Sequence, residues 1–238
     1  MKERKLMDTE MENRDEQVAS RLGLGVSGLD LLVYVLLALI AGALGYWLGA
    51  RQAGGPGTDS AEAGFARDMI THHAQAVEMA LLLRERSQDE ELRQIALDIL
   101  LTQQAQIGQM QGWLSTWSDP LRNRGYPLAN AGPAMAWMGM PTSGLMPGMA
   151  SPEQMNQLRA LEGGEADILF LQLMITHHQS GVEMAQAALE RAQRPEVRAL
   201  AQAMVDAQAY EIAVMEGILE EKGAQPVAAP QGMEEGHH

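Results

Sequence analysis

The chain contains an internal duplication, and no other feature of its sequence restricts the fold as strongly. The segment MITHH at residues 69–73 recurs at residues 174–178, and VEMA at residues 77–80 recurs at residues 182–185. Both recurrences are separated by 105 positions, and the offset continues without a gap through the rest of the unit. Repetition at one fixed offset is typical of two copies of one supersecondary unit, so both copies are expected to share one fold.

Each copy predicts two long helices joined by a tight turn. Ser87 and Glu90 form a capping-box pattern at the start of the second helix of the first copy. In the second copy, Pro195 suits the first turn of the last helix and Gly223 suits its end. The helices are expected at about residues 59–86, 87–117, 165–192 and 195–223.

Four helices in two hairpins predict an all-α fold, an antiparallel four-helix bundle with internal pseudo-two-fold symmetry. In an up-down-up-down bundle the first and third helices run parallel on a diagonal. Their MITHH segments could then meet at the axis, although two separate sites are equally allowed. A linker rich in Pro, Gly and Met precedes a short helix capped by Ser151. The bundle domain is therefore expected over residues 64–223, with repeats at 64–117 and 165–223 and the Met-rich linker at 118–150.

An apolar stretch near the N-terminus predicts one transmembrane helix at residues 31–50, because residues 31–48 carry no charge and are mostly apolar. Five Lys and Arg residues lie in residues 1–30, against one in the linker at 51–63. This bias favours a cytoplasmic N-terminus and an exported bundle, on the periplasmic or extracellular side. A buried core helix and a cleaved signal peptide are the alternatives. Residues 224–238 are expected to form a flexible tail.

The composition excludes several classes of function. The chain has no cysteine, which rules out disulfide scaffolds, thiolate zinc sites and iron–sulfur clusters. Its formal net charge of -14 argues against nucleic acid as a partner. Soft sulfur must therefore come from the 17 methionines.

The MITHH segments carry the candidate chemistry. Helical periodicity places Met69, His72 and His73 on the apolar side of their helix, near the middle of the bundle. Imidazole with thioether is a ligand set that suits copper as Cu(I) or Cu(II), whereas zinc and iron sites seldom use methionine. A purely structural role for the buried histidines is the alternative. The candidate metal ligands are Met69, His72, His73, Met174, His177 and His178.

Other side chains are expected near these ligands as second-sphere or auxiliary groups. If the first hairpin turns near Ser87, Gln103 comes level with His72, and Gln106 comes level with Met69. The remaining auxiliary candidates are Met79, Met184, Gln208 and Glu211. Taken alone, Met79 and Met184 are more typical of core residues than of ligands. Five further methionines in the linker fit either a copper-handling tract or an apolar flap over the bundle.

The blocks FARDMITHHAQAVEMA and LFLQLMITHHQSGVEMA resemble the bacterial domain-of-unknown-function family 305 over about residues 64–223. The resemblance implies a ferritin-like bundle, usually exported or membrane-anchored, with some members associated with copper, and it implies the same six ligands. One departure is visible: Gln106 stands where the second copy has Glu211. The leading hypothesis is a membrane-anchored copper-binding protein that passes metal to or from unidentified proteins. A metal-free structural or partner-binding bundle is the first alternative. A di-metal oxidase is the second, although Glu-x-x-His occurs only in the C-terminal tail.

Overall fold

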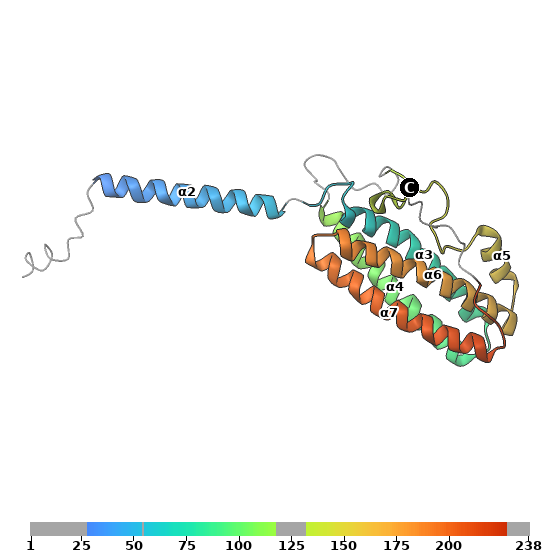
Figure 1. Cartoon of the computed structure of the whole chain (residues 1–238). Helices are drawn as coiled ribbons and strands as arrows, with labels where there is room; N and C mark the ends of the chain where they lie inside the picture. Colours follow the sequence, from blue (N-terminus) through green and yellow to red (C-terminus); the bar gives the residue numbers. More distant parts are fainter. Residues whose placement is uncertain (1–27, 54, 118–131, 228–238) are drawn as a thin grey trace, which may run out of the picture. The chain divides into compact units, whose positions relative to one another are not determined.

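The computed structural model describes residues 28–53, 55–117 and 132–227, and within these ranges the chain is helical, with no strand (Figure 1). The prediction of an all-α fold is confirmed. The expectations for residues 1–27 and 118–131, and for most of the tail, lie outside the described residues. The α-helices are α2 (Gly28–Ala53), α3 (Ala61–Arg86), α4 (Glu90–Trp117), α5 (Pro152–Ala160), α6 (Gly163–Arg191) and α7 (Pro195–Glu221), with a short 3-10 helix η2 (Ala136–Met138).

Helix α2 belongs to a compact unit that ends at Gly54, and the second unit begins at Gly55. The segment Leu29–Trp47 has a mean hydropathy of 2.1, and none of its most apolar stretch is buried within the protein. By length and composition it is the one helix among the described residues that could cross a membrane. The helix extends a few residues beyond both predicted bounds.

The ends of two helices, α5 and α7, follow their sequence signals. Ser151 Oγ accepts a hydrogen bond from Gln154 N at 3.2 Å, and Gln154 Oε1 accepts one from Ser151 N at 2.7 Å, so the predicted start of α5 is confirmed. Pro195 opens α7, and Gly223 follows its end with a φ of 73°.

The predicted capping box at the start of α4 is wrong. Ser87 ends α3 instead, because its backbone N–H donates to Leu83 O at 2.7 Å. The cap of α4 is Asp89, whose carboxylate accepts from Leu92 N at 3.2 Å. Because the backbone of Ser87 is extended and α4 is capped by Asp89, the turn between α3 and α4 is two residues longer than the sequence pattern predicts.

Each repeat forms a hairpin: α3 packs on α4, α6 packs on α7, and the hairpins meet where α3 packs on α6 (Figure 1). Glu62, in the first turn of α3, accepts a hydrogen bond from Gln193 N, just beyond the end of α6, at 2.7 Å. Helices α3 and α6 are therefore antiparallel, and the expectation of a parallel pair is wrong. The cause is the connection between the repeats, which carries the chain to the far end of α3 before α6 begins.

This connection follows the outer face of α3, and its residues 132–150 are called the strap below. Asp68 Oδ2 accepts hydrogen bonds from Met135 N and Trp137 Nε1, both at 2.8 Å. Seven residues further along α3, Gln75 Oε1 accepts a hydrogen bond from Ala150 N at 2.7 Å, and Gln75 Nε2 donates one to Ala150 O at 2.9 Å. The strap methionines pack as an apolar flap on the core between these two anchors. Met135 and Met146 are buried, and Met138, Met140 and Met149 are partly buried.

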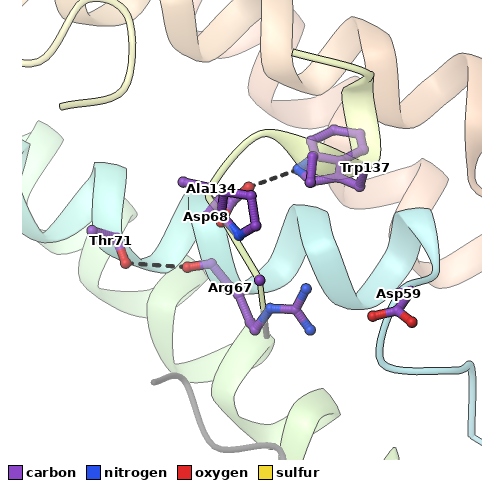
Figure 2. Close-up of a pocket in the computed structure, with 9 residues that line it drawn as sticks. Asp59, Arg67, Asp68, Thr71, Ala134 and Trp137 are labelled. Atoms are coloured by element: carbon purple, nitrogen blue, oxygen red, sulfur yellow. Dashed lines mark hydrogen bonds between the residues drawn. The ribbon is translucent and has the colours of Figure 1, made fainter. Parts of the chain in front are cut away.

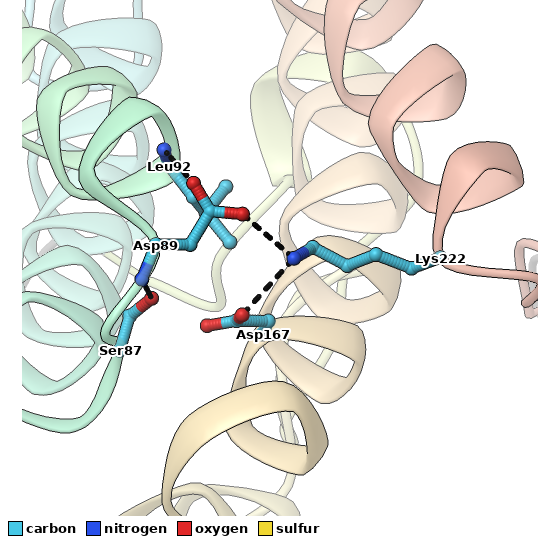
Figure 3. A network of polar contacts seen from close by, with 5 residues as sticks. All are labelled: Ser87, Asp89, Leu92, Asp167 and Lys222. Carbon is cyan, nitrogen blue, oxygen red and sulfur yellow. Dashed lines mark hydrogen bonds and ion pairs between the residues drawn. The ribbon is translucent and has the colours of Figure 1, made fainter.

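A polar network closes the end of the domain where α6 begins (Figure 3). Lys222 Nζ lies 2.7 Å from Asp89 Oδ2 and 3.1 Å from Asp167 Oδ2. The hydrogen bond with Asp89 raises the pKa of Lys222, and the same bond lowers the pKa of Asp89. The lysine therefore joins the α3–α4 turn, the start of α6 and the end of α7.

Replacing this lysine should destabilise the domain. We expect Lys222→Met to lower the free energy of unfolding by about 1–3 kcal/mol at pH 7, because Asp167 would stay buried without its cation. Because the pKa of Asp89 is lowered, its share of the stabilisation is present above pH 3.8 and is lost as the pH falls through its folded value. Urea unfolding followed by circular dichroism measures the difference. Lys222→Arg is the control; equal stability of the Met variant and the wild type would contradict the prediction.

The equivalent positions at the other end use different chemistry. Moving Lys222, Asp89 and Asp167 by 105 positions gives Trp117, Arg194 and Glu62. There the Arg194 guanidinium lies 5.5 Å from the centre of the Trp117 ring, a cation–π contact, and Arg194 also pairs with Glu196 at 3.1 Å. The repeat thus preserves the backbone arrangement while the side chains that close each end have diverged.

Candidate metal centre

All six predicted ligands are buried in the core. The four histidines are at most 1% exposed, and both methionines are fully buried. The helical period explains this, since Thr71 and Ala74, on the opposite side of α3, are exposed. The residues concerned are Met69, His72, His73, Met174, His177 and His178.

The two repeats meet at one pair of imidazole rings. The rings of His72 and His177 are stacked, with centroids 3.7 Å apart and planes inclined by 30°. His177 Nε2 donates to the backbone carbonyl of His72 at 3.0 Å. The equivalent histidines of the two repeats therefore form one shared centre between α3 and α6.

The second histidine of each repeat is held by the returning helix of its own hairpin. His73 Nε2 lies 2.7 Å from Gln106 Oε1, and His178 Nε2 lies 2.8 Å from Glu211 Oε2. Each oxygen can only accept, so each Nε2 carries a proton, and a neutral ring then keeps a free lone pair on Nδ1. Both Nδ1 atoms are buried without a hydrogen-bond partner. A ring that donates one N–H to an oxygen and keeps the other nitrogen free has the arrangement of a metal-binding histidine.

Burial favours the neutral form of His72, His73 and His177. Desolvation, followed by repulsion between the neighbouring imidazoles, places the pKa of His72 and of His177 well below the usual 6.5. Desolvation likewise lowers the pKa of His73 to about 3, although its bond to Gln106 opposes the shift. Neutral imidazole is the form that binds metal ions.

The auxiliary residues are only partly where the sequence places them. Glu211 contacts His178, but neither Gln103 nor Gln208 forms a hydrogen bond with a histidine, and the whole Gln103 amide is buried without a partner. Gln106, expected beside Met69, instead reaches His73. Helical side chains point toward the N-terminus of their helix. The Gln106 side chain therefore extends toward the α3–α4 turn and contacts His73, about one turn beyond Met69 on α3.

The methionines predicted as ligands lie on either side of the histidines. Met69 and Met184 belong to one core cluster, and Met174 and Met79 belong to the other. In the part of the chain that the structure describes, no group of three His, Asp or Glu side chains is gathered closely enough to hold a metal ion. Any ion at this centre would therefore need thioethers, movement of the rings, or both.

The strap covers the centre. The Pro147 carbonyl lies close enough to favour the charged form of His72, yet both ring nitrogens of His72 lack a hydrogen bond of normal geometry. Next to it, Gly148 has a φ of 75°, and a Cβ atom there would lie 2.5 Å from Ser180 Cβ and 2.8 Å from Thr176 O. Only glycine allows the strap to approach α6 so closely.

Comparisons with known proteins agree on one family. The sequence profile of the domain of unknown function DUF305 matches residues 62–219. A candidate secreted DUF305 protein from Streptomyces coelicolor is 44% identical, with a TM-score of 0.66 over 72% of this chain and 99% of that one. A DUF305 fragment from Deinococcus radiodurans is 36% identical, with a TM-score of 0.54 over 68% and 96%. CopM in its Cu(II)-bound form is 25% identical, with a TM-score of 0.53 over 68% and 97%. No curated protein matches the chain.

Proposed function

The chain belongs to the DUF305 family, and we propose that it is a membrane-anchored protein that binds copper outside the cytoplasm, for buffering or transfer. In this proposal the four long helices form a ferritin-like four-helix bundle, and α2 anchors it in the membrane with the N-terminus in the cytoplasm. The apolar helix and the excess of basic residues before it support this topology.

The observation that carries the proposal is the set of free imidazole nitrogens in the shared centre. A buried polar atom without a partner costs about 1–3 kcal/mol, so a core that keeps several of them needs a compensating interaction. Lone pairs on His73 Nδ1, His178 Nδ1 and His72 could supply that interaction by binding a soft cation. CopM, which has a Cu(II)-bound form, shares the fold over most of this chain.

The proposed ligands differ in what they contribute. The histidines His72, His73, His177 and His178 tolerate both oxidation states of copper, and the thioethers of Met69 and Met174 favour Cu(I). Glu211 and Gln106 orient His178 and His73. Met79 and Met184 line the flanking core on either side.

Titration of the purified chain with Cu(I) and with Cu(II) tests the proposal. We expect saturable binding by the wild type and at least a hundredfold loss of affinity when all four histidines are changed to Ala. Met155→Leu, a buried methionine outside the centre, is the matched control. Unchanged stoichiometry and affinity in the histidine variant would disprove the proposal.

The hydrogen bonds of His73 and His178 also favour a second candidate, a structural or partner-binding bundle without metal. Elemental analysis of protein purified from copper-containing medium separates the two candidates. Stable, folded protein that gains no metal would support the structural role.

The Glu211 carboxylate beside the centre should affect the two oxidation states of copper differently. We expect Glu211→Gln to weaken Cu(II) binding about tenfold and Cu(I) binding less, because the lost negative charge stabilises a divalent ion more strongly. Gln106→Glu, the reciprocal change in the first repeat, should have the opposite effect. Competition titrations with chelators of each ion measure both. Equal losses for the two ions in the Gln variant would show that Glu211 acts only by orienting His178.

A further inference from the structure

A cavity lies between the start of α3 and the strap, away from the candidate metal centre, and no histidine or methionine lines it (Figure 2). Its volume is about 410 Å³, which is large enough for a small organic molecule. Polar side chains come from the α3 side and apolar ones from the strap. The lining includes Asp59, Arg67, Asp68, Thr71, Pro133 and Trp137.

Arg67 brings a buried positive charge to this cavity. Arg67 is only 9% exposed, and its Nη1 donates a hydrogen bond to the backbone carbonyl of Thr58 at 2.6 Å. Within the described ranges this is the only hydrogen bond that its guanidinium makes, and it forms no ion pair there. None of its remaining nitrogens is sealed in the core, so those donors reach the cavity. A guanidinium with free donors and little solvent is suited to a carboxylate.

Two carboxylates face the same cavity. Asp68 uses Oδ2 to hold Met135 N and Trp137 Nε1, which leaves Oδ1 available. Burial raises the pKa of Asp68, and the bonds from Met135 and Trp137, together with the positive charge of Arg67, oppose that shift. Asp59 is exposed, and its carboxylate accepts a hydrogen bond from Thr58 Oγ1 at 3.5 Å. The cavity therefore presents both signs of charge.

This combination selects among classes of ligand. A simple anion would be opposed by both Asp side chains and by the net charge of -14 on the chain. A simple cation would be opposed by Arg67. A neutral molecule that carries both a carboxylate and an ammonium group satisfies all three side chains at once, and Pro133 and Trp137 offer an apolar wall to the rest of it.

We infer that this cavity binds a small zwitterion of the α-amino-acid class, with its carboxylate on Arg67 and its ammonium on Asp59 and Asp68. The site is independent of the copper centre, and binding of the amino acid does not require metal.

Three matched probes test the inference on the full chain in detergent micelles, prepared without metal. L-leucine carries both charged groups, 4-methylpentanoate lacks the ammonium, and 3-methylbutylamine lacks the carboxylate. Saturation-transfer NMR and isothermal titration calorimetry should show saturable binding of L-leucine, and at least tenfold weaker binding of each analogue. No binding of L-leucine, or equal binding of either analogue, would overturn the inference.

Two substitutions assign the contacts. Arg67→Gln should weaken L-leucine at least tenfold, because it removes the carboxylate partner. Asp59→Asn, at an exposed position that leaves the strap anchored, should weaken L-leucine about threefold to tenfold and should not weaken 4-methylpentanoate. Arg191→Gln removes an exposed guanidinium that pairs with neighbouring Glu190, and it should change nothing. L-leucine binding that survives both Arg67→Gln and Asp59→Asn would overturn the inference, whatever the outcome of the copper titrations.

Discussion

Lowering the pH from 7 to 5 is expected to remove about 5–6 kcal/mol from the free energy of unfolding of the helical domain. In the folded state, burial holds the pKa of His72, His73 and His177 below its usual 6.5, so the rings stay neutral. In the unfolded chain the same rings take up protons below pH 6.5. Stability is therefore complete above that pH and falls by up to about 1.4 kcal/mol per group per pH unit below it. Because a domain has only about 5–15 kcal/mol in total, this loss should bring it close to unfolding.

Urea titrations at a series of pH values, followed by circular dichroism, measure this slope. His73→Leu removes one of the three titrating rings, so its stability should fall about two-thirds as steeply with pH as that of the wild type. Lys222→Met is a suitable control, because it lowers stability at neutral pH without changing a histidine. A free energy of unfolding that stays constant between pH 7 and pH 5 would show that the rings are hydrated or already charged in the folded protein.

Replacing Gly148 with Val should open the strap. The backbone there has a φ of 75°, which costs a β-branched residue about 1–3 kcal/mol, and the new side chain would collide with Ser180 and Thr176. Together these costs should raise the population of the displaced strap by about a hundredfold or more. The histidines, now at most 1% exposed, should react with diethyl pyrocarbonate faster by a similar factor. Copper, if it binds as proposed, should enter and leave correspondingly faster.

The strap offers its own control. Gly144 has ordinary backbone geometry, and a Cβ atom there would meet nothing within 4 Å. Gly144→Val should therefore leave the modification rate unchanged. Equal reactivity of the Gly148 variant and the wild type would mean that reagents and ions reach the histidines by a path that does not displace the strap.

The sequence predicts those parts of this structure that depend on local rules. Helix ends follow Ser151 and Pro195, and the inward turn of the histidines follows the 3.6-residue period. The antiparallel arrangement of α3 and α6 depends instead on the route of the connection. That route is fixed by isolated long-range bonds such as those between Asp68 and Trp137, which leave no periodic pattern.

The same distinction applies within the candidate site. The MITHH repeat identifies His73 and His178, because both are placed by helical spacing. The spacing predicts Gln103 close to these histidines and Gln106 away from them, because residue spacing fixes Cα positions but not the direction of long side chains. Nothing in the spacing identifies the Arg67 cavity, since it forms only when the strap folds back over α3.

The pairing of His73 with a neutral amide and of His178 with a carboxylate has an evolutionary consequence. Two identical chains related by a two-fold axis would have to carry the same residue at both positions, so they could offer no carboxylate or two, never one. Fusion of the copies into a single gene removes that constraint, because each half mutates alone. The imidazole centre could then acquire one negative charge, that of Glu211. One negative charge neutralises one monovalent cation.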